Sequence, residues 1–126
     1  MDCLARAFAH ATHTDYAKLV KDIGHSAPYH IQEIIEVLGS RFSITEVSCS
    51  DIDPTCPYTP ERIQHWIAEY SGVLAYWTGL DKMHAVAYNH KNGMLWDNGT
   101  YRIPSDFYTI FWIVEPRPFR KFSDTQ

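Results

Sequence analysis

The chain has 126 residues, which is enough for one folded domain with a hydrophobic core and too few to expect two. Hydrophobic residues make up 45% and charged residues 21%, close to the averages of globular proteins, which argues against a disordered chain. The formal net charge is -4 and no basic run exceeds Arg120-Lys121, which argues against a nucleic-acid-binding protein. No apolar stretch approaches the ~20 residues that cross a bilayer, so we expect no membrane role.

The amino-terminal residues and the cysteines indicate a compartment. Polar and charged residues at Asp2, Arg6 and His10 interrupt the first ten positions, so these positions do not form a signal-peptide core. An odd number of cysteines does not suggest a disulfide framework, and at least one thiol should be free. We therefore expect a cytoplasmic protein. The three cysteines are Cys3, Cys49 and Cys56.

The first third of the chain predicts three short helices, because apolar residues recur there at spacings of three and four. Asp2 is a preferred N-cap residue, so Cys3 opens the first helix. Gly24 and Gly39 end the second and third helices. The predicted helices cover residues 3 to about 11, 15–23 and 31–38.

After Gly39 the pattern changes to the alternation and the β-branched and aromatic residues of strands. The segment SDIDPTCPYTP predicts a loop, since its prolines and aspartates suit neither a ladder nor a helix, and a fourth helix should follow over 61–70. Helices followed by an antiparallel sheet give the class α+β, in a single domain over 1–126. The predicted strands are FSITEVS, GVLAYW, HAVAYNH, GMLWDN and FYTIFWIVEP.

The thiol of Cys3 stands at the start of the first predicted helix. A thiol attacks as the thiolate, and a helix amino terminus supplies partial positive charge and unpaired N–H groups that stabilise it. An imidazole can then hold the thiolate as an ion pair and protonate the leaving group, while a third polar group orients the ring. A cysteine in a small domain is more often a buried filler, so Cys3 indicates a nucleophile only together with such partners.

Hairpin geometry selects His84 from the seven histidines. His84 begins the strand HAVAY and Asp97 ends the strand GMLWD, and NHKNG joins them. A turn centred between His90 and Lys91 puts His84 opposite Asp97, with Cβ atoms ~5 Å apart. A two-residue turn at Asn92-Gly93 places Asp97 opposite Tyr88 instead, and the two-residue alternation still keeps His84 and Asp97 on one face. Asn98 would face the other way, so Asp97 is the better orienting group.

The stretches DCLARAFAHAT, MHAVAYN and WDNG together resemble the papain-like cysteine peptidases in their compact form, in particular bacteriocin-processing peptidases and small phage-encoded relatives. In those families an Asp-Cys pair opens a helix rich in Ala and Leu, a His precedes apolar strand residues, and an Asp stands beside Gly or Pro. The resemblance covers most of the chain in order. It implies that helices pack on a carboxyl-terminal antiparallel sheet, that Cys3 is the nucleophile, His84 the general base and acid, and Asp97 the orienting residue. It also points to a phage or bacterial source.

Residues that would support the reaction around Cys3 are harder to find. Papain-like enzymes place a glutamine several residues before the cysteine, where its amide donates to the oxyanion, and here only Met1 and Asp2 precede Cys3. Losing one such donor typically costs ~10² to 10³ in turnover, so either the Cys3 N–H and another group suffice or catalysis is weak or lost. Trp96 is a candidate to cover the histidine and Asp97 from water. The candidate substitutes for the glutamine are Gln32, Gln64 and Asn98.

The sequence predicts no metal or other cofactor. Cys49, Cys56 and His65 could suggest a zinc site, but C-x6-C without a second close pair is poor metal spacing. His10 and His13 lie three apart near the end of the first helix, where a cation or a cap is the better interpretation.

The sequence therefore predicts a small α+β thiol hydrolase, a peptidase that cleaves a peptide or isopeptide bond in a phage or host protein. One alternative is a catalytically weak or inactive member of the same fold that binds a peptide or a host factor. Another is an acyl transferase or deamidase that uses the same triad. We expect a peptide or protein as the partner, and neither a nucleic acid nor a membrane.

Overall fold

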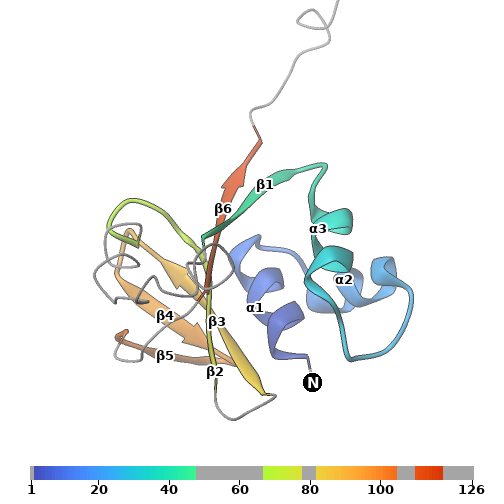
Figure 1. The fold of residues 1–126 in the computed structure, drawn as a ribbon, viewed down its shortest axis with the longest axis horizontal. Coiled ribbons are helices and arrows are strands. Elements are labelled where there is room, and N and C mark those ends of the chain that lie inside the picture. The colour runs from blue at the N-terminus through green and yellow to red at the C-terminus, as the bar shows by residue number, and fades with distance from the viewer. Residues whose placement is uncertain (1, 48–66, 78–81, 105–109, 118–126) are drawn as a thin grey trace, which may run out of the picture.

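The computed structural model describes residues 2–47, 67–77, 82–104 and 110–117. Over these ranges the chain forms three helices and a six-stranded antiparallel sheet, an α+β fold as the sequence predicts (Figure 1). Along the sheet the strands follow the order β1-β6-β2-β3-β4-β5. The helices are α1 (Cys3–Ala11), α2 (Tyr16–Ile23) and α3 (Ile31–Leu38), and the strands are β1 (Phe42–Val47), β2 (Gly72–Trp77), β3 (Met83–Asn89), β4 (Met94–Asp97), β5 (Thr100–Arg102) and β6 (Ile110–Pro116).

Local chemistry sets the bounds of the second helix. Asp15 is the N-cap of α2 rather than its first helical residue, because its side chain accepts a hydrogen bond from the Lys18 N–H. Gly24 ends α2 in the left-handed conformation, with φ of 94°, which glycine adopts without steric cost. The fourth predicted helix lies outside the described residues apart from its last positions, Ile67–Tyr70, of which Ile67 is helical.

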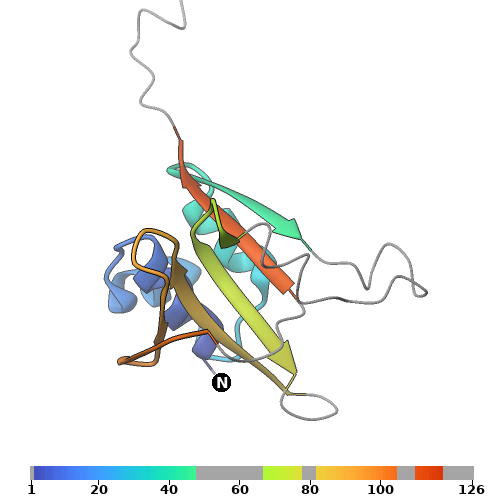
Figure 2. The ribbon, with the colours of Figure 1, turned by 90° about the vertical axis from the view of Figure 1, so that its left-hand side faces the viewer.

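The helices cover one face of the sheet, as Figure 2 shows. Alanine side chains on α1 and β3 let this helix and this strand approach closely, and α1 packs mainly on β3. Buried side chains from the central strands fill the opposite face of the sheet as well. The helix-side cluster includes Ala5, Phe8, Leu19, Ile34, Leu38, Val73, Ala85 and Trp112, and the opposite cluster includes Leu74, Val86, Tyr88, Leu95, Phe111 and Ile113.

The β3–β4 hairpin differs from both registers that the sequence predicts. Asn89 pairs with Met94 around a four-residue turn, and Ala87 pairs with Trp96, so one further step places Asp97 opposite position 86. The longer turn forms because the side chain of Asn89 accepts the Lys91 N–H, and that of Asn92 accepts the Met94 N–H. The shift is two positions from either prediction, and it therefore leaves the assignment of side chains to the two faces unchanged.

Strand β5 is an element that the sequence analysis missed. It pairs with β4 from Asp97 opposite Thr100, around a two-residue turn made by Asn98 and Gly99. Both turn residues have positive φ, 48° and 97°, as a type I′ hairpin turn requires. The Asn98-Gly99 dipeptide, which favours this turn, is the sequence signal that could have predicted β5. Within the described ranges, no helix is long and apolar enough to cross a bilayer.

Strand β2 should depend on Gly72, because a Cβ there would lie 1.9 Å from the backbone oxygen of Trp112 on β6. We expect Gly72→Ala to lower the free energy of unfolding by about 3 kcal/mol, since the backbone of β6 would have to move. Gly24→Ala is the control. A Cβ at position 24 meets nothing within 4 Å and only the positive φ is penalised, so the cost should be about 1 kcal/mol. Urea denaturation checks both values, and equal costs would contradict the close approach.

Candidate active site

Helix α1 and strand β3 begin at the same end of the molecule. The Sγ of Cys3 lies 3.7 Å from the carbonyl oxygen of Met83, the residue directly before His84. At the other end of α1, His10 stacks on Trp96, whose strand position is opposite Ala87 near the end of β3. The two elements therefore run in the same direction, and the start of α1 places the thiol against the residue that precedes His84.

The thiol itself is free and partly buried. Its sulfur contacts the carbonyl oxygen of Met83. This oxygen is two covalent bonds from the backbone nitrogen of His84. Standard peptide dimensions then place Sγ no more than about 6 Å from that nitrogen. The sulfur therefore lies close to the backbone of His84.

His84 and Asp97 meet through their side chains, on the face that the two-residue alternation predicts for both. The Nε2 of His84 lies 2.6 Å from the Oδ1 of Asp97, and the two side chains are 28% and 22% exposed. A carboxylate can only accept, so Nε2 is the nitrogen that carries the proton in this contact. The other ring nitrogen, Nδ1, is left for a proton exchange with a thiol.

The ring and the sulfur approach β3 from different sides. Cys3 and Met83 pack against the helix-side cluster, whereas His84 pairs with Tyr76 and its ring meets the Tyr76 ring edge-on at 5.5 Å. Among the described residues, no hydrogen bond joins Sγ to the imidazole, and the contact of the sulfur is with the backbone. Catalytic hydrogen bonds are often long or poorly aligned before substrate binds. A thiolate–imidazolium pair here requires the His84 ring to turn toward Cys3.

The side chains of Arg102 and Tyr76 contact the His84–Asp97 pair, and the sequence analysis predicted neither contact. Arg102 on β5 donates from Nε to the Oδ2 of Asp97 at 3.2 Å. Its Nη2 reaches the hydroxyl of Tyr76 at 3.5 Å. The Asn98-Gly99 turn could have revealed Arg102, because a two-residue turn pairs position 97 with 100 and leaves 102 on the same face.

Asp2 is the N-cap residue of α1, as the sequence predicts, but its side chain makes no capping hydrogen bond. Its Oδ2 accepts instead from the hydroxyl of Tyr16 at 2.6 Å and from the Nε of Arg6 at 3.0 Å. The hydrogen bond from Tyr16, and then Arg6, lower the pKa of Asp2, while burial and the Asp2 contact raise the pKa of Tyr16 to about 12. The first-turn N–H groups beside Cys3 therefore have no side-chain cap from Asp2, and the positive end of the helix stays open there.

The predicted supporting residues lie elsewhere. Gln32 is exposed on α3, Asn98 is exposed in the β4–β5 turn, and Gln64 falls outside the described residues. The role predicted for Trp96 as a cover of the pair is wrong, because its ring stacks on His10 of α1 at 4.2 Å with the planes 4° apart. Neighbouring residues of a strand face opposite sides, so Trp96 faces the helices while Asp97 faces away from them.

The residues considered for a metal do not come together in the described ranges, which contain no group of three or more His, Cys, Asp and Glu side chains suited to one. Cys49, Cys56 and His65 fall outside these ranges. His10 is not the exposed cation that its place near the end of α1 suggests. Its burial against Trp96 and the nearby charge of His13 lower its pKa, which favours the neutral ring.

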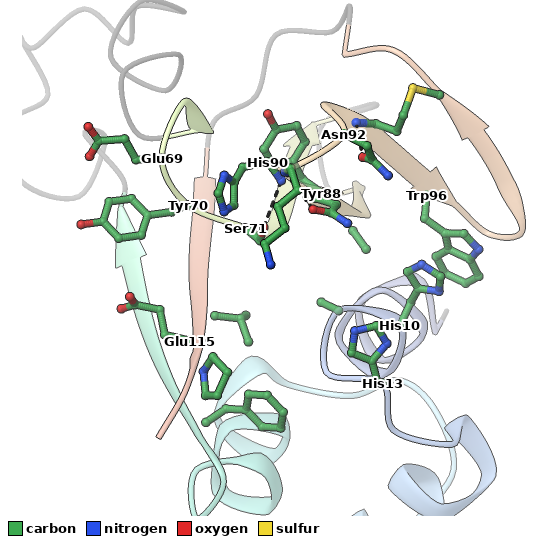
Figure 3. Close-up of a pocket in the computed structure, with 18 of the residues that line it drawn as sticks. His10, His13, Glu69, Tyr70, Ser71, Tyr88, His90, Asn92, Trp96 and Glu115 are labelled. Carbon is green, nitrogen blue, oxygen red and sulfur yellow. Dashed lines mark hydrogen bonds between the residues drawn. The ribbon is translucent and has the colours of Figure 1, made fainter. Parts of the chain in front are cut away.

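A hollow of about 780 Å³ opens at the opposite end of α1 and β3 (Figure 3). Its lining includes His10, Tyr88, His90 and Trp96, and Ser71 accepts the backbone N–H of His90 at its wall. None of Cys3, His84 and Asp97 lines it. The hollow is thus separate from the candidate active site.

A scan of protein-family models found none that matches the chain, and a search of curated proteins found no relative. The geometry of the described residues is therefore what supports a function.

The link between Asp2 and Tyr16 yields a stability prediction. We expect Tyr16→Phe to lower the free energy of unfolding by about 1 kcal/mol at neutral pH, because a partly exposed carboxylate loses a charge-assisted hydrogen bond. The folded-state pKa of Asp2 is lowered, so its contribution is present above the ordinary value of 3.8 and is lost as pH falls through the folded value. Urea unfolding should therefore show that Tyr16→Phe loses less unfolding free energy at acidic pH than at neutral pH. Tyr101→Phe, at a 58% exposed tyrosine, is the control and should cost little at either pH.

Proposed function

We propose that the protein is a thiol hydrolase of papain-like type that cleaves a peptide or isopeptide bond through Cys3, His84 and Asp97. The observation that carries the proposal is the 2.6 Å contact between His84 Nε2 and Asp97 Oδ1. This contact lies near the start of β3, and α1 begins with a free thiol at the same end of the molecule. A thiol, an imidazole and a carboxylate in this order are the components of nucleophilic acyl transfer. The likeness of the chain to compact bacteriocin-processing and phage-encoded peptidases agrees with this assignment.

The proposed reaction assigns a role to each of the three residues. With its ring turned toward Cys3, His84 takes the thiol proton at Nδ1, and the thiolate attacks the carbonyl carbon of the scissile amide. The tetrahedral intermediate collapses to a thioester as the imidazolium gives its proton to the leaving amine. Water, deprotonated by His84, adds to the thioester, and the thiolate leaves with release of the acid. Asp97 fixes the tautomer that presents Nδ1 to the sulfur.

The oxyanion needs donors that are already in place. The backbone N–H of Cys3 opens α1, and the side chain of Asp2 caps no N–H of this first turn. Uncapped N–H groups and the positive end of the helix dipole at the same point suit an oxyanion beside Sγ. This geometry favours the backbone over Gln32 and Asn98, which lie exposed on α3 and in a turn.

The setting of the proposed enzyme follows from the thiol. A nucleophilic cysteine must stay reduced, which the cytoplasm ensures, and for a phage-encoded protein this is the host cytoplasm. A phage precursor or a host protein is then the substrate class that we infer.

The proposal predicts a reactive thiol whose reactivity depends on His84. We expect iodoacetamide to alkylate Cys3 at least about tenfold more slowly in His84→Ala than in the wild type, because the imidazole no longer holds the thiolate. Tandem mass spectrometry of tryptic peptides separates the Cys3 adduct from those of Cys49 and Cys56, which serve as references in the same sample. His90→Ala, a histidine on the separate hollow, is the matched control and should leave the rate unchanged.

Equal rates of Cys3 alkylation in the wild type and in His84→Ala would contradict the proposed thiol hydrolase. They would favour the alternative of an inactive protein of the same fold that binds a peptide or a host factor.

Hydrolysis is tested on a peptide library. New termini should accumulate with the wild type and not with Cys3→Ser, because the hydroxyl is a much weaker nucleophile than the thiolate. The same reaction with added hydroxylamine distinguishes the acyl transferase, since transfer yields a hydroxamate and hydrolysis an acid. Identical product lists for the wild type and Cys3→Ser, in a sample whose Cys3 is reactive, would contradict peptide-bond cleavage.

A further inference from the structure

We propose that Arg102 is a positioning residue for the catalytic pair, and that it holds the carboxylate of Asp97 in the orientation that His84 needs. The inference rests on the proposed function and adds a fourth member to its triad. Arg102 belongs to none of the sequence stretches that carry the resemblance to peptidases. Its place follows from β5 alone, which brings the guanidinium to the far side of the carboxylate.

The carboxylate of Asp97 is held at both oxygens by different residues. Oδ1 lies 2.6 Å from the Nε2 of His84, and Oδ2 lies 3.2 Å from the Nε of Arg102. Asp97 is the last residue of β4, directly before a two-residue turn, where one contact would leave the carboxylate plane able to rotate. Two contacts from opposite sides fix that plane, and with it the direction from which the imidazole N–H is received.

Tyr76 connects the arginine back to the histidine. The Nη2 of Arg102 reaches the Tyr76 hydroxyl at 3.5 Å, a long hydrogen bond. Tyr76 is the register partner of His84 across β2 and β3, and its ring meets the imidazole edge-on at 5.5 Å. The four side chains therefore form a closed ring of contacts across β2, β3, β4 and β5. Each of the four side chains thus contacts two others of the set.

The burial of this ring makes the contacts effective. The side chains of His84, Asp97 and Arg102 are 28%, 22% and 27% exposed, so water screens their interactions less than it screens surface pairs. The positive charge of Arg102 also offsets part of the attraction between Asp97 and an imidazolium. Arg102 therefore contributes by fixing the orientation of the Asp97 carboxylate, and not by strengthening the electrostatic attraction between Asp97 and the imidazolium of His84.

The β4–β5 turn is what places Arg102 there. Asp97 pairs with Thr100 across the Asn98-Gly99 turn, and Arg102 follows two residues later on the same face. A turn longer or shorter by one residue would send the side chain at 102 to the other face of the sheet. The type I′ turn and the contact between Arg102 and Asp97 thus require the same register of β5 on β4.

The test compares Arg102→Met with Arg102→Lys. Methionine removes the donor, and we expect Cys3 alkylation by iodoacetamide to slow about tenfold as the Asp97 carboxylate loses its orientation. Lysine keeps a charged donor and should recover most of the rate. Arg41→Met, at an exposed arginine on the opposite edge of the sheet, is the matched control and should leave the rate unchanged. Should Arg102→Met not fold, Tyr76→Phe removes only the hydroxyl partner and should slow alkylation about twofold to threefold.

A second readout separates positioning from mere stability. The proton on His84 Nε2 that is shared with Asp97 should give a downfield resonance in the proton NMR spectrum of the wild type. We expect this resonance to broaden or move in Arg102→Met and to persist in Arg102→Lys and Arg41→Met. An unchanged resonance together with an unchanged alkylation rate in Arg102→Met overturns the assignment. Failure of the proposed function looks different, because wild-type Cys3 alkylation would then be independent of His84 whatever the resonance shows.

Discussion

The docking of α1 on β3 is the constraint on which the rest of this structure depends. Alanines at positions 5, 7 and 9 of the helix, and at 85 and 87 of the strand, are buried, and their small side chains permit a close approach. Because helix and strand run in the same direction, this approach brings Sγ to 3.7 Å from the carbonyl oxygen of Met83. Larger side chains along this contact would separate the thiol from the histidine that follows.

The second constraint is the pairing of β3, β4 and β5 through two different turns. The four-residue turn of the first hairpin places Asp97 diagonally from His84, and the two-residue turn of the second returns Arg102 to the same carboxylate. The polar residues of the proposed site thus come from three successive short strands. Their order in the sheet is local, so the pair and its arginine can form without long-range contacts beyond the hairpins.

The two ends of α1 differ in the side chains that surround them. At the start of α1 the thiol contacts Met83, whose chain neighbour His84 contacts Asp97 on the other side of β3, while at the end of α1 His10 stacks on Trp96 beside a broad hollow. The alternation of β4 explains the division, since Trp96 and Asp97 are adjacent and face opposite sides of the sheet. The same two-residue period therefore assigns one residue to packing and its neighbour to the proposed site.

The sequence by itself determined the three helices, five of the six strands in the described ranges, and the shared face of His84 and Asp97, because periodicity and alternation are local properties of the chain. It did not determine that the Asp2 carboxylate accepts from the side chains of Tyr16 and Arg6 rather than from a backbone N–H of α1, since the contact with Tyr16 depends on how α2 packs. Only the tertiary structure decided that Arg102 and Tyr76 complete the surroundings of His84, because their contacts join four strands at registers that turn geometry sets.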